Sequence, residues 1–79
     1  MNVEVMRQCL ATAKDAEGKL FAWNAQTTTD TPPRIIESAA KHYFTKHYSA
    51  NVDFQLETYL AEIDIDTGVE IKRVEQENN

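Results

Sequence analysis

Two histidines and one cysteine are the residues of this sequence best suited to metal binding or nucleophilic catalysis. His42 and His47 are five residues apart, and in a helix this spacing separates their side chains by about 140° around the axis. Zinc-binding pairs on a helix are three or four residues apart, so that both rings project together. Cys9 has no nucleophile motif beside it, although a histidine could meet it in space. We therefore expect no metal site, no cofactor and no catalytic residue, with Cys9 a small core side chain.

Asp64 and Asp66 form a second arrangement that could do chemistry, because acid–base catalysis often uses two carboxylates. On one face of a strand they would lie about 7 Å apart. An acid–base pair also needs surroundings that separate its two pKa values, and a solvated strand face does not provide them. We expect these two carboxylates to be solvated and not catalytic.

The acidic residues are concentrated in the last part of the chain, which has a net charge of −5. Residues 1–50 contain six Lys/Arg against five Asp/Glu, whereas residues 51–79 contain two against eight. This excess argues against direct nucleic-acid binding, since phosphate contacts require basic side chains. It suits a protein partner with a basic surface, and the alternative is a solvated face without a partner. The acidic candidates for partner binding are Glu57, Glu62, Asp64, Asp66 and Glu70.

These carboxylates are expected to gather on one face of a C-terminal hairpin. Glu62 and Asp64 would project from the same side of one strand, with Glu70 nearby on the next. Like charges that face one another destabilise a sheet. Such a face therefore favours a role in docking over a purely structural one.

Phe21 and Trp23 are the aromatic candidates for partner binding, and they share one face of a predicted strand. If the helix covers the other face, these two rings form an exposed aromatic patch of the kind that marks a binding site. If the helix covers their own face, they belong to the core and Leu20 is exposed instead. The pattern leaves both alternatives open.

The clearest predicted element is a helix over residues 32–48. Thr31 is a good N-cap, and Pro32 and Pro33 are tolerated in a first turn. Apolar residues then recur at three- and four-residue steps, which is typical of a helix with one buried side. This stripe consists of Ile36, Ala39, Ala40, Tyr43, Phe44 and His47.

Strict alternation of apolar and polar residues predicts a hairpin near the C-terminus. Residues 59–66 and 69–72 alternate with period two, which indicates strands with one buried face. Asp66-Thr67-Gly68 between them supplies the positive-φ residue of a short turn. Val52, Phe54 and Leu56 belong either to the same long strand or to a separate piece before a bulge.

The first 27 residues contain two competing patterns. Residues 3–13 fit a strand, but they also fit a helix. Asp15-Ala16-Glu17-Gly18 is typical of a four-residue hairpin turn with Gly in the left-handed region, and it favours two strands. Sequential strands usually pair. We therefore predict an α+β fold of order ββαββ, with a four-stranded antiparallel sheet and one helix packed on one face.

Size and composition predict one domain over residues 1–74, followed by a frayed tail at 75–79. A 79-residue chain with 42% hydrophobic residues has room for one small core and little for a deep pocket. The lone Cys9 cannot form an internal disulfide, which favours the cytoplasm. No apolar run has the length of a membrane span, and the N-terminus does not resemble a signal peptide.

The layout of the chain resembles the small acidic proteins with which bacteriophages block host machinery, anti-CRISPR proteins among them. The resemblance lies in the small size, the strand–DAEG–strand unit followed by TPPRIIESAAKHYF, and the acidic hairpin IDIDTGVEI. It implies a compact domain that occupies a basic channel of a nucleic-acid-binding complex. It assigns no functional residue.

Three hypotheses for function follow from these patterns. The first is a non-enzymatic binding protein that docks through its acidic hairpin, as an inhibitor of a nucleic-acid-binding complex. The second is a structural or accessory subunit whose exposed sheet edge or outer face forms a homodimer. The third is a small metal protein or enzyme that uses Cys9 and the histidines.

Overall fold

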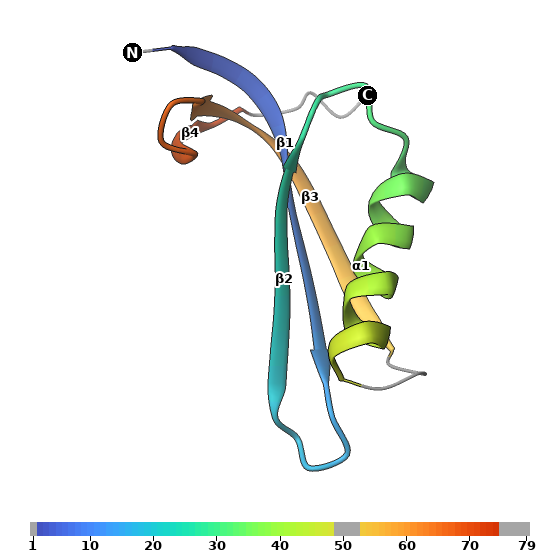
Figure 1. The fold of residues 1–79 in the computed structure, drawn as a ribbon. Helices are drawn as coiled ribbons and strands as arrows, with labels where there is room; N and C mark the ends of the chain where they lie inside the picture. Colours follow the sequence, from blue (N-terminus) through green and yellow to red (C-terminus); the bar gives the residue numbers. More distant parts are fainter. Residues whose placement is uncertain (1, 49–52, 75–79) are drawn as a thin grey trace.

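The elements follow one another in the order that the hydrophobic pattern predicts (Figure 1). The computed structural model describes residues 2–48 and 53–74, so the expected tail at 75–79 and Val52 lie outside the described residues. The α+β class and the ββαββ order are confirmed. The elements are β1 (Val3–Lys14), β2 (Leu20–Thr27), α1 (Pro33–His47), β3 (Phe54–Asp64) and β4 (Val69–Arg73).

The four strands form one antiparallel sheet in the order β2-β1-β3-β4. β1 lies at its centre and pairs with β3 from Val3 to Ala13 and with β2 from Arg7 to Lys14. Residues 3–13 are therefore a strand, and the alternative helix is wrong. The turn chemistry that favoured the strand is present, since Gly18 has a φ of 82° and the Asp15 carboxylate accepts two backbone N–H groups of the turn.

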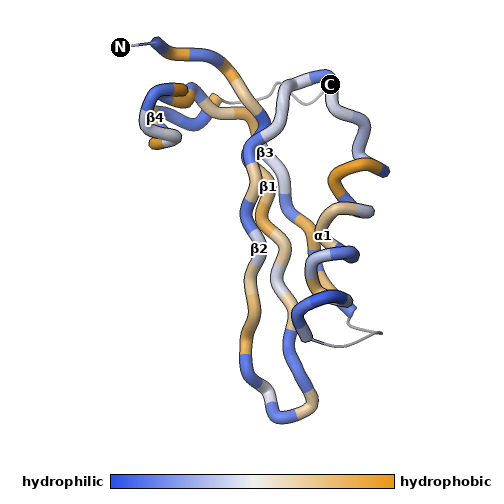
Figure 2. Tube along the Cα trace, in the orientation of Figure 1, coloured by the Kyte–Doolittle hydropathy of each residue, from blue (hydrophilic) through white to orange (hydrophobic). Residues whose placement is uncertain are grey.

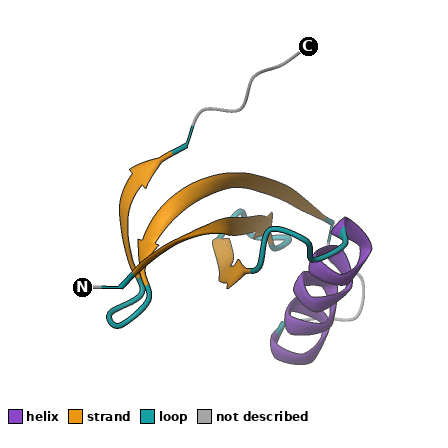
Figure 3. Cartoon of the chain, turned by 90° about the horizontal axis from the view of Figure 1, so that it is seen from above, coloured by secondary structure: helices purple, strands orange, loops and turns teal. Residues whose placement is uncertain are grey.

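The sheet has two faces, which the pairing register defines. The helix face carries Cys9, Ala11 and Ala13 of β1, with Phe21 and Trp23 of β2 and Phe54 and Leu56 of β3 in the same rows. The open face carries every second residue of three ranges: Met6 to Lys14 on β1, Leu20 to Gln26 on β2 and Gln55 to Ile63 on β3. Figure 3 shows the strands arching from end to end, with α1 on one side of the sheet.

The helix begins one residue later than its sequence signals indicate. Pro32 is the N-cap and makes no side-chain capping bond, while its carbonyl accepts the N–H groups of Ile35 and Ile36. The expectation that Thr31 caps the helix is wrong, because its hydroxyl is hydrogen-bonded to that of Thr28. The proline pair sets the start instead, since its fixed φ suits a first turn.

Small residues on both sides let the helix lie close to the sheet. Ala11 of β1 and Ala40 of α1 are both fully buried, and Ala13 and Phe44 complete the buried cluster. Larger side chains surround this cluster and are half-buried: Phe21, Trp23, Tyr43, Phe54 and Leu56. The helical stripe is narrower than predicted, because its buried residues are Ile36, Ala40 and Phe44, whereas Ala39 and His47 are exposed.

A second, smaller buried group lies on the open face. Ala61 and Ile63 of β3 are fully buried, although both project away from the helix. The β3–β4 hairpin crosses this end of the open face, since Gln8 and Gln26 of that face bond to Glu70 and Gly68 of the hairpin. Figure 1 shows the hairpin on the side of the sheet opposite α1. The hairpin thus covers the part of the open face that contains Ile63.

Replacement of Phe44 by Ala is expected to destabilise the domain by about 3–5 kcal/mol, because it removes a fully buried ring and leaves a cavity. The ring is 1% exposed and lies 5.5 Å from that of Phe54, between centroids. The matched control is Ile35→Ala, next to the buried Ile36 in the sequence but on the exposed side of α1, which is expected to change stability by less than about 0.5 kcal/mol. Urea unfolding followed by circular dichroism measures both, and equal effects would contradict this core.

Candidate functional site

The β3–β4 hairpin is held on the open face by a small set of polar contacts. The Gln26 amide donates to the Gly68 carbonyl at 2.7 Å, and the Gln8 amide donates to the Glu70 carboxylate at 3.1 Å. The Tyr59 hydroxyl donates to the same carboxylate at 2.6 Å, and the Arg73 guanidinium lies 4.3 Å from the centre of the Tyr59 ring. These contacts join β4 to β1 and β3 and the turn before it to β2, and they fix the direction of the hairpin.

Glu70 is the central residue of these contacts. Hydrogen bonds from Tyr59 and then Gln8 hold the pKa of the Glu70 carboxyl below its ordinary value, because both favour the charged form. The same contact raises the pKa of the Tyr59 hydroxyl, which donates to a carboxylate. Glu70 is therefore a structural carboxylate at neutral pH, and its Oε1 accepts hydrogen bonds from two of the protein's own side chains.

The five acidic candidates do not form one face, so the expected arrangement of Glu70 beside Glu62 and Asp64 is wrong. Glu62 and Asp64 are on the side of β3 that faces the helix, whereas Glu70 is opposite Ile63 and therefore lies on the open face. The cause is a β-bulge, which shifts the register between Glu62/Lys72 and Ile63/Glu70 by one residue. A one-residue shift moves a side chain to the other face of a sheet.

The remaining acidic candidates are also separated. Glu57 is opposite Leu10 and belongs to the open face. Asp66 lies in the turn between β3 and β4, where its backbone N–H donates to the Asp64 carboxylate at 3.0 Å. The five candidates are thus divided: Glu62 and Asp64 lie on the helix face, Glu57 and Glu70 lie on the open face, and Asp66 lies in the turn.

Exposed apolar side chains accompany Glu62 and Asp64. Asp64 lies between Val3 and Val69 in one row across three strands, and Glu62 lies between Val5 and Lys72 in the next. Val3, Val5 and Val69 are exposed by 43%, 46% and 59%. We name this set the hairpin-end surface: Val3, Val5, Glu62, Asp64 and Val69.

The hairpin-end surface lies beyond the start of the helix, where α1 does not cover the sheet (Figure 1). Ile65 and Ile71 are also exposed at this end of the molecule. Five of the eight large apolar side chains that are exposed among the described residues are therefore found here. Figure 2 shows apolar and polar residues following one another closely along this hairpin. Sequence reasoning identified its acids, and it missed its valines because their alternation indicated a buried face.

Phe21 and Trp23 belong to the helix face and pack against the buried core. The alternative in which they project from the uncovered face is wrong. The Phe21 ring stacks on that of Tyr48, with 3.7 Å between centroids. Leu20 takes the open face and is 66% exposed. The two rings are half-buried parts of the core and do not form an exposed aromatic patch.

Cys9 and the histidines are not brought together. Cys9 is 3% exposed in the sheet, and burial raises the pKa of its thiol. His42 and His47 are exposed on the helix, and His47 packs beside Tyr43, with 4.6 Å between ring centroids. Within residues 2–48 and 53–74, no group of three or more His, Cys, Asp or Glu side chains is arranged to hold a metal ion.

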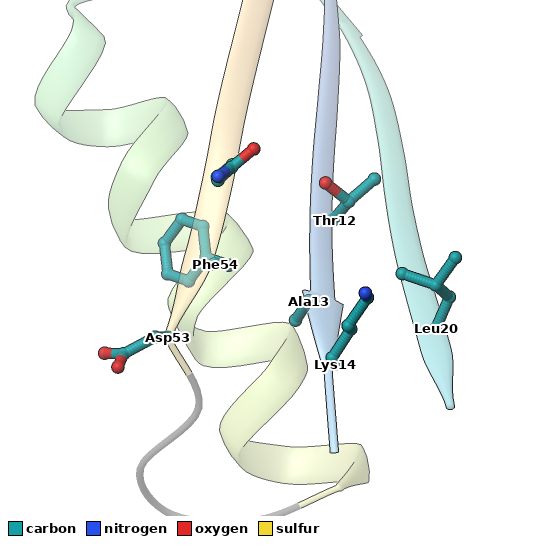
Figure 4. A pocket seen from close by; sticks show the side chains of 7 residues that line it. Thr12, Ala13, Lys14, Leu20, Asp53 and Phe54 are labelled. Atoms are coloured by element: carbon teal, nitrogen blue, oxygen red, sulfur yellow. The ribbon is translucent and has the colours of Figure 1, made fainter. Parts of the chain in front are cut away.

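A shallow hollow, shown in Figure 4, lies where β1 ends and β2 and β3 begin, at the end of the sheet far from the β3–β4 turn. It has a volume of about 460 Å³ and is open to solvent. Lys14 and Asp53 are its charged residues, and Thr12, Ala13, Leu20, Phe54 and Gln55 complete the lining. A lysine, a hydroxyl and an amide of this kind can contact a polar partner, and the described residues of the lining include no histidine or cysteine for nucleophilic chemistry.

Glu70→Gln is expected to remove a pH-dependent part of the stability of the hairpin. The folded-state pKa of Glu70 is lowered, so its contribution is complete above the ordinary glutamate pKa and is lost as the pH falls through the folded-state value. In the wild type, the unfolding free energy should therefore fall over the acidic range where carboxylates titrate, and the Glu70→Gln variant should show a shallower fall. Urea unfolding at a series of pH values measures this, with Glu57→Gln as control on the same face. Identical slopes for all three proteins would contradict the assignment.

Comparisons with protein-family models, with curated proteins and with solved structures give no significant match for this chain. Among the residues that the structure describes, no helix combines the length and apolar character needed to cross a membrane.

Proposed function

We propose that this chain is a non-enzymatic binding protein that docks on another protein through the hairpin-end surface. The observation that carries the proposal is the composition of two neighbouring rows, in which exposed valines flank Asp64 and Glu62. Apolar area supplies most of the free energy of association, and charges select the partner and speed the encounter. A surface that combines both is suited to specific docking.

The geometry of the hairpin supports this role. Glu70, Tyr59, Gln8 and Gln26 fix the hairpin on the open face, so that the outer side chains are held in place before a partner arrives. A surface that is ordered in the free protein loses less conformational entropy on binding. The carboxylates of Glu62 and Asp64 are then available for contacts with another molecule.

The partner is expected to present basic side chains around an apolar patch. Nucleic-acid-binding proteins have such basic surfaces, because they must neutralise phosphates. In its finer form, the proposal makes this chain an inhibitor that occupies such a surface, as its resemblance to small phage proteins implies. The charge balance of residues 51–79, two basic against eight acidic, supports this finer form.

The test is affinity capture from a native host lysate with immobilised wild-type protein and with the Glu62→Lys/Asp64→Asn variant. Asparagine at position 64 keeps an acceptor for the Asp66 N–H, so the turn is preserved while the charge is lost. The wild type should retain a basic protein that elutes with salt, because screening weakens exposed charge contacts. The variant should retain much less of it.

The matched control is Glu17→Gln/Glu37→Lys, which makes the same total change in charge. Both positions are exposed, one in the β1–β2 turn and one on α1, away from the β3–β4 hairpin. This control is expected to capture the partner as the wild type does. If the two double variants lose the partner equally, net charge and not the hairpin-end surface is responsible. If neither loses it, docking through Glu62 and Asp64 is wrong.

A further inference from the structure

The outer edge of β2 lacks the sequence features that protect natural edge strands from pairing. Edge strands are usually interrupted by charged side chains, proline or a bulge. β2 reads LFAWNAQT, with no charged residue and no proline, and it pairs with β1 in eight consecutive positions without a register shift. β4, at the other edge, contains Glu70, Lys72 and Arg73 and carries the bulge. The two edges of this sheet therefore differ in their capacity to accept another strand.

We propose that β2 pairs with β2 of a second copy of this chain, giving a symmetric dimer with one continuous eight-stranded sheet. This dimer is separate from the docking proposed above, since β2 and the hairpin-end surface have no residue in common. A two-fold axis perpendicular to the sheet makes the two strands antiparallel and leaves both helices on the same side. Neutral strands can meet in this way without facing like charges.

The ladder between β1 and β2 fixes the register of the proposed pairing. The Asp15 N–H donates to the Lys19 carbonyl, which marks this position as a hydrogen-bonded pair of the ladder. Since such pairs alternate, the backbone groups of Leu20, Ala22, Asn24 and Gln26 are directed to the outer edge. A symmetric ladder that uses all four places Leu20 opposite Gln26 of the second copy and Ala22 opposite its Asn24. Trp23 then lies beside the axis.

This register also brings complementary surfaces together on the open face. The hairpin tip rests on Gln26, through its bond to Gly68, and carries Asp66. The residue opposite Gln26 is Leu20 of the second copy, the most exposed large apolar side chain of the described residues. Leu20 borders the shallow hollow, and Lys14 lies in the same row on the same face (Figure 4). In the proposed dimer, the hairpin tip of each copy therefore lies on the same face as Leu20 and Lys14 of the other, and Asp66, which accepts a hydrogen bond from Asn2 in its own chain, is the charged residue of that tip.

Sedimentation equilibrium on the purified chain, from micromolar to millimolar concentration, tests the dimer directly. The expected result is a mass that rises towards twice the 9.0 kDa of one chain. Asn24→Lys places two like charges near the axis and should raise the dimer dissociation constant about tenfold or more. Asn24 is exposed in the single chain, so this change should leave the fold intact, which circular dichroism verifies. Ser38→Lys, on the exposed side of α1, makes the same charge change and should leave the dissociation constant as in the wild type.

A charge exchange tests the register. Lys14→Glu and Asp66→Lys should each weaken the dimer, and the double variant should recover most of the loss, because the two groups meet again with their charges reversed. The fluorescence of Trp23, the one tryptophan of the chain, should shift with concentration in parallel with the mass. A mass of one chain at millimolar concentration would overturn the proposal, as would an Asn24→Lys dimer as tight as that of the wild type. Two independent losses without recovery in the double variant would overturn the register.

Discussion

The one-residue register shift between β3 and β4 is the constraint on which the rest of this structure depends. It places Glu70 opposite Ile63 on the open face and leaves Glu62 opposite Lys72 on the helix face. Without the shift, Glu70 would lie opposite Asp64, and two carboxylates would meet across the hairpin. With it, Glu70 accepts hydrogen bonds from Tyr59 and Gln8, and the hairpin covers Ala61 and Ile63. The bulge thus separates a structural carboxylate from two that remain available to a partner.

A domain of this size has to use both faces of its sheet. The helix buries a cluster of three alanines and Phe44 on one face, which is a small core even for a short chain. The folded hairpin adds Ala61 and Ile63 on the other face. Because the hairpin reaches only one end of the open face, the remainder is left exposed around Leu20. The sheet is therefore exposed wherever neither α1 nor the β3–β4 hairpin covers it.

The sequence was sufficient to predict the local elements, and their relations in space were harder to predict. The helix over Pro33–His47 and the turns at Gly18 and Gly68 were predictable, because their signals lie within a few neighbouring residues. The face of Phe21 and Trp23 depends on where the helix packs, which no local pattern specifies. The direction of Glu70 depends on the bulge, and the alternation of residues 69–72 continues through it without interruption. The acidic residues of the hairpin could be located along the sequence, whereas their distribution over the two faces of the sheet could not be predicted.

The central claim is that the exposed side chains of the hairpin-end surface form the contact with a partner protein. The most direct measurement is methyl NMR of the chain, titrated with the protein that it captures. The account predicts that the methyl signals of Val3, Val5 and Val69 shift or broaden, while the buried Ile36 and the exposed Ile35 of α1 keep theirs. Shifts that are confined to α1, with the three valines unchanged, would contradict it.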